Sequence, residues 1–214
     1  RPAVFNAHFG WAQLTAATGH QEPAYRWWQT ADRSQFDNQH LDDLFYAARH
    51  GRADSLALEV GLVQVERQPE GRRLLELAQV MLDAGQPVAA LGELRSLRKE
   101  NRPDIAAAVD DTYMAALQAA AQAGADVGAE ARAYALDGLA GRPAPDRAAA
   151  LIELLLASGS AGDAMPHIAG MTDRDPDRWI PTYVEAARAT DQTDRAVDLL
   201  DREHAGAMPR DRRE

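Results

Sequence analysis

A glycine, replaced once by aspartate, returns along the chain every 32 to 39 residues, and this period constrains the fold more than any other feature. The six positions are Gly19, Gly51, Gly85, Gly124, Gly159 and Asp191. Glycine commonly ends an α-helix in a left-handed conformation and opens the turn that follows. The period therefore predicts a series of helical hairpins, each with its turn at one of these residues.

Two further positions, in the expected second helix of each hairpin, follow the same period. Five residues after the turn comes a mostly small side chain, which lets two helices cross closely: Ala24, Leu56, Ala90, Ala129, Ala164 and Ala196. Four residues later comes a mostly apolar side chain: Trp28, Val60, Leu94, Ala133, Ile168 and Leu200. Proline interrupts a helix, and five prolines lie where hairpins would end or begin: Pro69, Pro103, Pro143, Pro176 and Pro209.

The rest of the sequence is helical in character. Ala contributes 44 of the 214 residues, residues 74–82 place apolar side chains at helical spacing, and no segment alternates as a strand does. The sequence predicts an all-α fold, a right-handed α-solenoid of about six stacked helix-turn-helix hairpins. We expect the hairpins at residues 6–33, 38–67, 71–100, 104–141, 146–172 and 177–205. We expect residues 1–214 to form a single solenoid with a lengthened turn at 124–128. The chain begins with Arg1 and not with Met, so we also expect it to be a fragment of a longer protein.

The pattern resembles the tetratricopeptide repeat (TPR), a hairpin of about 34 residues with small residues at the helix crossing and a closing proline. The segment that fits best carries Leu74, Leu77, Ala78, Met81, Gly85, Ala90, Leu94 and Pro103 in register. Sel1-like and HEAT-like helical arrays are alternatives, because the small residue expected in the first helix is replaced by a larger one in several hairpins.

No catalytic or metal-binding motif accompanies the repeat. The chain has no Cys, its one lysine is not followed by Ser or Thr as in a phosphate-binding loop, and its six histidines lack metal-ligand spacing. We interpret residues 159–162 as a turn and not a nucleophile elbow, and the acidic run 173–177 as a loop that caps the next helix. The aspartate pairs 42–43 and 110–111 are interpreted as residues of first helical turns. We therefore expect a protein that is not an enzyme, with no catalytic residue, no metal and no cofactor.

The net charge is −10, from 33 acidic and 23 basic residues. This excess opposes broad contact with a phosphate backbone, so we expect no nucleic-acid partner. No apolar run approaches the length of a membrane span, so we expect no direct membrane insertion of this segment. The lack of Cys fits the cytosol and the periplasm equally well.

Aromatic residues gather near the N-terminus. Nine of the 13 precede residue 47: Phe5, Phe9, Trp11, Tyr25, Trp27, Trp28, Phe36, Phe45 and Tyr46. Trp11 and Trp28 fit the core register, whereas Tyr25 and Trp27 flank that register and cannot all face inward. Trp and Tyr dominate protein-binding hot spots. The flanking aromatics are therefore expected either to bind a partner or to pack against a preceding hairpin outside this chain.

In TPR proteins the first helices of successive hairpins line a groove that binds a peptide, a helix or a protein surface. The resemblance implies groove positions at Phe9, Gln13, Leu41, Phe45, Arg49, Arg72, Gln79, Asp83, Gln118, Gln122, Glu153, Glu185 and Arg188. With Tyr25 and Trp27 these residues form the expected partner-binding set. The Lys and Asn residues that bind a C-terminal carboxylate in chaperone-binding members are missing.

We expect a noncatalytic scaffold that recruits another protein through this groove, the N-terminal aromatic surface, or both. The Ala- and Arg-rich repeats also resemble bacterial solenoids of exopolysaccharide export and biofilm assembly. That resemblance implies a periplasmic location and an envelope enzyme, or neighbouring repeats of the same chain, as the partner. The alternatives are a solenoid that binds a carbohydrate or peptide ligand, with Tyr25, Trp27 and Phe45 as stacking platforms, and a sensor arm of a cytoplasmic regulator.

Overall fold

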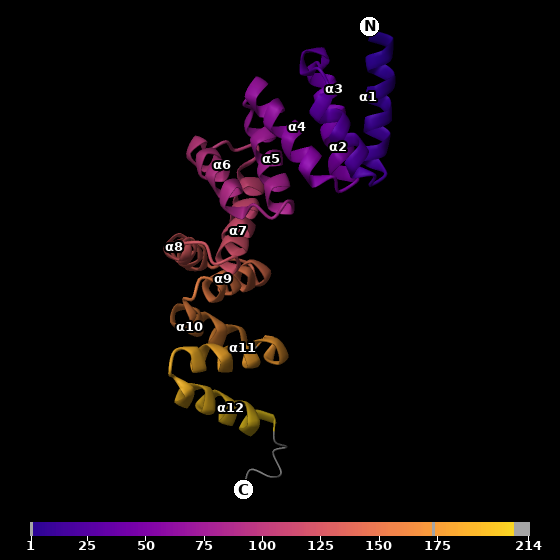
Figure 1. Ribbon diagram of the computed structural model, residues 1–214. Coiled ribbons are helices and arrows are strands. Elements are labelled where there is room, and N and C mark those ends of the chain that lie inside the picture. The colour runs from indigo at the N-terminus through magenta and orange to yellow at the C-terminus, as the bar shows by residue number, and fades with distance from the viewer. Residues whose placement is uncertain (1, 173, 208–214) are drawn as a thin grey trace. The chain divides into compact units, whose positions relative to one another are not determined.

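The computed structural model describes residues 2–172 and 174–207. Over these residues the chain forms α-helices, one short 3-10 turn at Arg33–Gln35 and no strand (Figure 1). The helices are α1 Pro2–Ala17, α2 Gln21–Thr30, α3 Asn38–His50, α4 Asp54–Arg67, α5 Gly71–Asp83, α6 Pro87–Glu100, α7 Ala106–Gln122, α8 Gly128–Ala140, α9 Pro145–Ala157, α10 Ala161–Thr172, α11 Pro176–Ala189 and α12 Thr193–Ala207. The predicted all-α fold of consecutive helix pairs is confirmed. Asp173 and Pro209, used above, lie outside the described residues.

The chain divides into two compact units, residues 1–119 and 120–214, and the division falls within α7. The expectation of a single continuous solenoid concerns how these units join, and it stays a prediction.

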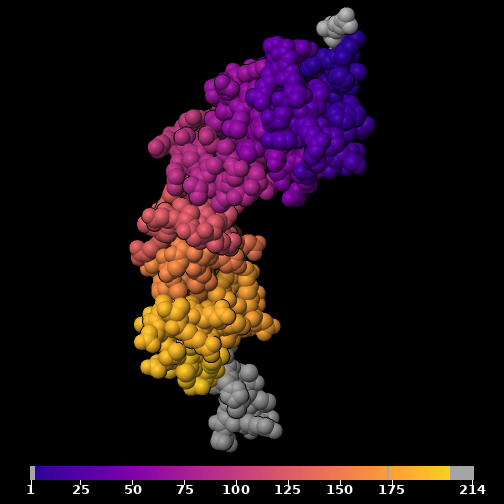
Figure 2. Space-filling model, viewed as in Figure 1, coloured from indigo at the N-terminus to yellow at the C-terminus, as the bar shows by residue number. Residues whose placement is uncertain are grey.

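In the first unit the helices of the first three hairpins pack in pairs, and neighbouring hairpins are joined through contacts of α1, α2 and α4. α1 contacts α2 and α3, α2 also contacts α4, and α4 contacts α5. Side chains fill the spaces between these helices (Figure 2). The core runs from α1 to α5 and contains the fully buried side chains of Trp28, Leu44, Phe45 and Leu56.

In the second unit consecutive helices from α8 to α12 contact one another in chain order. Apolar residues on α9 and α10, among them Leu151, Ile152, Leu155 and Ile168, are buried almost completely. The side chain of Asp175 caps α11 by accepting a hydrogen bond from the Arg178 backbone N–H at 3.4 Å, as the sequence predicted for this acidic loop.

The predicted left-handed turns are present at five of the six positions. Gly19, Gly85, Gly124, Gly159 and Asp191 all have φ between 57° and 80°. Gly51 is the exception, because the left-handed residue there is Arg52, with φ 57°. Gly51 is needed for a different reason: a Cβ at this position would lie 1.8 Å from the backbone oxygen of Ala16 on α1.

The predicted register of buried residues is correct in every hairpin except the fourth and the last. Ala129 and Ala133 are exposed, and Ala131 and Ala135 are buried in their place. The lengthened turn is the cause, because α8 begins four residues after Gly124 whereas α2, α6 and α10 begin two residues after their turn glycines. On α12, Leu199 is buried where Leu200 was expected.

Candidate protein-binding surfaces

Most of the N-terminal aromatic rings pack on one another. Phe36, between α2 and α3, is buried, and its ring lies 5.0 Å from Phe5, 5.6 Å from Trp27 and 5.3 Å from Trp28, measured between ring centroids. Phe9 adds an edge-to-face contact with His40 at 4.8 Å. These contacts join α1, α2 and α3, so much of the aromatic content serves packing within the chain itself.

Tyr25 forms a contact between the first and second hairpins. Its hydroxyl donates a hydrogen bond of 2.6 Å to Glu59 on α4. The same carboxylate accepts hydrogen bonds from the Trp28 indole N–H at 2.9 Å and from Gln29 at 2.7 Å. The hydrogen bond to Glu59, and then burial, raise the pKa of Tyr25 above its ordinary value. The role of Tyr25 in this structure is therefore to hold α2 against α4.

The predicted burial of Trp11 is wrong. It was expected in the core, but its side chain is 46% exposed, whereas Trp28 is fully buried as predicted. The buried side of α1 is formed by Phe9, Ala12 and Ala16, and Trp11 lies outside this stripe.

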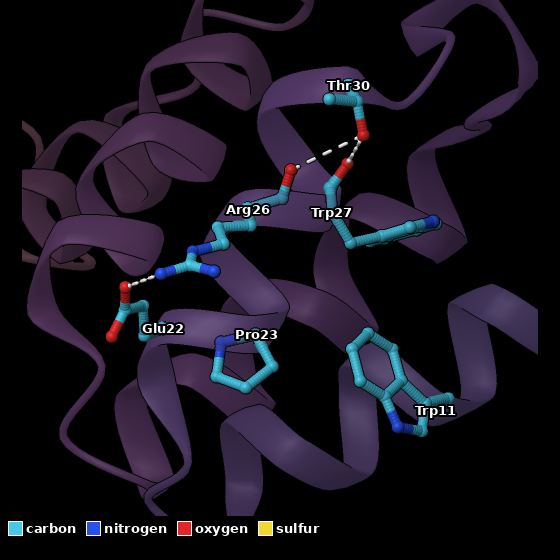
Figure 3. A pocket seen from close by; sticks show the side chains of 6 residues that line it. All are labelled: Trp11, Glu22, Pro23, Arg26, Trp27 and Thr30. Carbon is cyan, nitrogen blue, oxygen red and sulfur yellow. Dashed lines mark hydrogen bonds and ion pairs between the residues drawn. The ribbon is translucent and has the colours of Figure 1, made fainter.

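Trp11 and Trp27 line a hollow of about 510 Å³ on the outer side of α1 and α2 (Figure 3). Its other lining residues are Glu22, Pro23, Arg26 and Thr30. Arg26 forms an ion pair with Glu22, and the Thr30 hydroxyl donates to the backbone oxygen of Trp27 at 3.1 Å. The hollow thus presents two indole rings and a proline beside polar groups that are already paired.

A second hollow lies between α1 and α3, the first helices of two neighbouring hairpins. We call it the α1–α3 groove; it has a volume of about 690 Å³ and is lined by Gly10, Gln13, Leu14, Ala17, Asp43, Tyr46, Ala47 and His50. Leu14 is 64% exposed and Tyr46 is 52% exposed, although both are large apolar side chains. The Tyr46 hydroxyl donates to Glu76 on α5 at 3.2 Å, and burial together with the charge of Glu76 raises the pKa of Tyr46.

The expected groove residues of the first unit divide into two groups. Phe9, Leu41 and Phe45 are buried and stabilise the core, so their side chains are not presented to a partner. The apolar stripe of a first helix faces the other helices, and these three of the positions carried over from the TPR pattern belong to it. The remaining six residues of this unit reach its surface: Gln13, Arg49, Arg72, Gln79, Asp83 and Gln118.

Two of these surface residues are brought into contact. The Arg49 guanidinium donates to the side-chain oxygen of Gln79 at 3.4 Å, and the amide of Gln79 donates to the Thr112 hydroxyl at 3.5 Å. This polar row crosses α3, α5 and α7. Arg72 lies 3.6 Å from Glu76 on the same helix. No described contact links Arg72 or the other three residues to this row.

In the second unit, Glu153 on α9 forms an ion pair with Arg178 on α11. Gln122, at the end of α7, and Glu185 and Arg188, on α11, are exposed. No described contact joins these four predicted residues into one site.

The predicted position of the aspartate pairs 42–43 and 110–111 is wrong. Neither lies in a first helical turn, since α3 begins at Asn38 and α7 at Ala106. Asp42 accepts a hydrogen bond from Gln64 at 2.6 Å and forms an ion pair with Arg73 at 3.2 Å, and so links α3, α4 and α5. Its role in this structure is to connect helices.

Leu14 and Tyr46 are surface residues that the sequence analysis did not assign to binding, although Tyr46 belongs to the N-terminal aromatic group. α1 carries apolar residues on all its sides, more than one buried stripe can take up. This excess was the sequence signal that an apolar residue of this helix, such as Leu14, would stay exposed.

Over residues 2–172 and 174–207, no cluster of three or more His, Asp or Glu is arranged to hold a metal ion, and no described helix is long and apolar enough to span a membrane. No family model, curated protein or solved structure matches the chain.

Proposed function

We propose that this chain is a noncatalytic scaffold that binds an amphipathic helix of a partner protein in the α1–α3 groove. The observation that carries the proposal is the pair of exposed apolar side chains, Leu14 on α1 and Tyr46 on α3, that line this groove together with small residues. Small residues at Gly10, Ala17 and Ala47 leave room for the side chains of a helix. Helix-in-groove recognition uses this combination of an apolar groove and polar edges.

The energetics favour a protein partner. Leu14 and Tyr46 each leave much of their apolar surface in water, and covering such surface contributes roughly 25 cal/mol per Å² before the cost of association is subtracted. Gln13, Asp43 and His50, which also line the groove, supply hydrogen-bonding groups. A partner helix with apolar residues on one face and polar residues at its borders therefore complements the groove.

The test fills the groove without disturbing the fold. A Cβ at Gly10 would meet no atom within 4 Å, so Gly10→Leu extends into the groove and also removes a glycine from a helix interior. Gly92→Leu on α6 is the matched control, since its Cβ likewise meets nothing within 4 Å and lies away from the groove. Affinity capture from the source organism, followed by mass spectrometry, compares the three proteins.

We expect a partner that is retained by the wild type and by Gly92→Leu and is lost or weakened at least about tenfold with Gly10→Leu, a loss of about 1.4 kcal/mol. Equal retention by Gly10→Leu would show that the groove is not the binding site. The narrower expectation of a role in exopolysaccharide export, the compartment and the ligand-binding alternatives stay predictions.

A further inference from the structure

The α1–α3 groove is lined by residues that have the same spacing on both of its helices. On α3 they are Asp43, Tyr46, Ala47 and His50, and on α1 they are Gly10, Gln13, Leu14 and Ala17. In each helix the later three lie three, four and seven residues after the first, so that all four share one face. The groove is therefore formed by one continuous face of each helix, about two turns long.

The two helices run in the same direction along the groove. In its first part, the ring of Phe9 on α1 lies 4.8 Å from the ring of His40 on α3, measured between centroids. Where both helices end, a Cβ at Gly51 would lie 1.8 Å from the backbone oxygen of Ala16. Asp43, three residues after His40, therefore lies in the part of the groove where both helices begin.

Asp43 gives this part of the groove a negative charge. It is the only carboxylate among the lining residues, and neither Lys nor Arg lines the groove. The Gln39 amide donates a hydrogen bond to its Oδ1 at 2.8 Å, and over residues 2–172 and 174–207 no ion pair of Asp43 is present. The side chain is partly exposed. Its charge is therefore accessible to a cation, which a carboxylate binds more strongly than a neutral donor.

Tyr46 holds an aromatic ring beside this carboxylate. It lies three residues after Asp43, on the same face of α3, and is 52% exposed. Its hydroxyl donates to Glu76 at 3.2 Å, and its ring packs edge-to-face against Phe45, with the centroids 5.6 Å apart. Arg72 lies 3.6 Å from Glu76 and compensates its charge. The face of an aromatic ring attracts Lys and Arg, so a cation that pairs with Asp43 can also contact Tyr46.

We infer that the partner helix is basic: a Lys or Arg beside its apolar stripe pairs with Asp43 and contacts the Tyr46 ring, while the stripe itself covers Leu14. The inference rests on the proposed function, because it names the chemistry of the helix that binds the same groove. Charge complementarity supports it. A neutral helix would cover the carboxylate without a counter-charge, and an acidic one would be repelled. The net charge of −10 also favours encounter with a basic partner.

The test selects peptides on the whole chain. The probe is a displayed library of helical peptides of about 18 residues, with Leu fixed at helical spacing on one face. Lys, Arg, Glu, Asp and Gln are varied at the positions beside the Leu residues. The library is selected against the wild type, Asp43→Lys, Asp43→Asn and Gly10→Leu. Glu66→Lys is the matched control, because it makes the same change of charge at an exposed position of α4, which does not line the groove.

We expect the wild type and Glu66→Lys to enrich Lys or Arg over Asp or Glu at one of the varied positions by at least about tenfold. Asp43→Asn loses this preference, because the side chain keeps its shape but not its charge. Asp43→Lys reverses the preference toward Asp or Glu. Circular dichroism of every variant, together with the isosteric Asp43→Asn, excludes misfolding as the cause.

Gly10→Leu separates this inference from the proposed function. Suppose that the wild type enriches peptides that Gly10→Leu loses, but without a preference for Lys or Arg, or with one that Asp43→Lys leaves unchanged. A helix then still binds the groove, and the inference is overturned. If the wild type enriches no peptide, or Gly10→Leu enriches the same peptides, the proposed function fails and the inference fails with it.

Discussion

At the scale of single residues, the contacts between hairpins depend on a few carboxylates that each receive several donors. Glu59 is the example in the first unit, with Tyr25, Trp28 and Gln29 of α2 as donors. Trp28 is fully buried, so its indole N–H depends on Glu59 for a hydrogen-bond acceptor. A buried donor without an acceptor lowers the free energy of unfolding. Glu59 therefore stabilises the packing of α2 against α4.

Glu59→Ala is expected to lower the free energy of unfolding by about 1–3 kcal/mol, the cost of leaving a buried donor without a partner. Glu66→Ala, on the exposed side of the same helix, is the matched control and is expected to change stability by no more than about 0.5 kcal/mol. Urea denaturation followed by circular dichroism measures both. Equal effects of the two substitutions would contradict the role given to Glu59.

A pH dependence follows from the pair Arg132 and Asp163. The hydrogen bond from Arg132 lowers the pKa of Asp163 below its ordinary value. Because the folded pKa lies below the unfolded one, the pair stabilises the fold above about pH 4, and this stabilisation is lost as the pH falls through the folded pKa. Arg132→Gln is expected to raise the pKa of Asp163 toward its ordinary value, as measured by NMR titration of the carboxyl carbon. Arg188→Gln, an exposed change on α11, should leave the titration unaltered; an unshifted Asp163 in Arg132→Gln would disprove the pairing.

At the scale of elements, the turn glycines serve two different purposes. Gly19, Gly85, Gly124 and Gly159 provide positive φ angles, which glycine adopts without strain. Gly51 has an ordinary φ of −84° and instead permits α3 to end against the backbone of α1. The two purposes look identical in the sequence, because both require the same residue at the same interval.

Gly51→Ala is expected to destabilise the protein by about 2–3 kcal/mol or more, since its methyl group would overlap the Ala16 carbonyl and force the two helices apart. Gly92→Ala introduces the same methyl group into open space within a helix. It should stabilise the protein by about 0.5–1 kcal/mol. Thermal and urea denaturation of the two variants provide the comparison, and a Gly51→Ala protein as stable as the wild type would refute the close approach.

The predicted buried positions were wrong in two helices, α8 and α12. Repeat spacing predicted Ala129 and Ala133 as buried, whereas the two extra residues of the turn move burial to Ala131 and Ala135. A lengthened turn is visible in the sequence, but the number of its residues that join the following helix is not. That number depends on where the helix first finds packing partners.

At the scale of the whole molecule, the described contacts run between neighbouring hairpins within each of the two compact units. Stability in such repeats is approximately a sum of local terms, so damage in one hairpin has little effect on distant ones. Hydrogen exchange measured by mass spectrometry tests this locality. In Glu59→Ala, the amides of α1 to α4 are expected to exchange faster while those of α9 to α12 keep the wild-type rate. Uniformly faster exchange along the chain would instead indicate that the protein unfolds as one cooperative unit.

The sequence by itself determined the all-α class, the hairpin period and most of the buried positions. These features follow from local sterics: a left-handed turn selects glycine, a close helix crossing selects alanine, and an apolar stripe must be buried. Only the tertiary structure decided which large apolar residues remain in water, among them Trp11, Leu14 and Tyr46. Helical periodicity places a side chain on one side of its own helix, but exposure depends on whether another helix covers that side. For this reason the α1–α3 groove and the hollow beside Trp11 and Trp27 became visible only after the helices were packed.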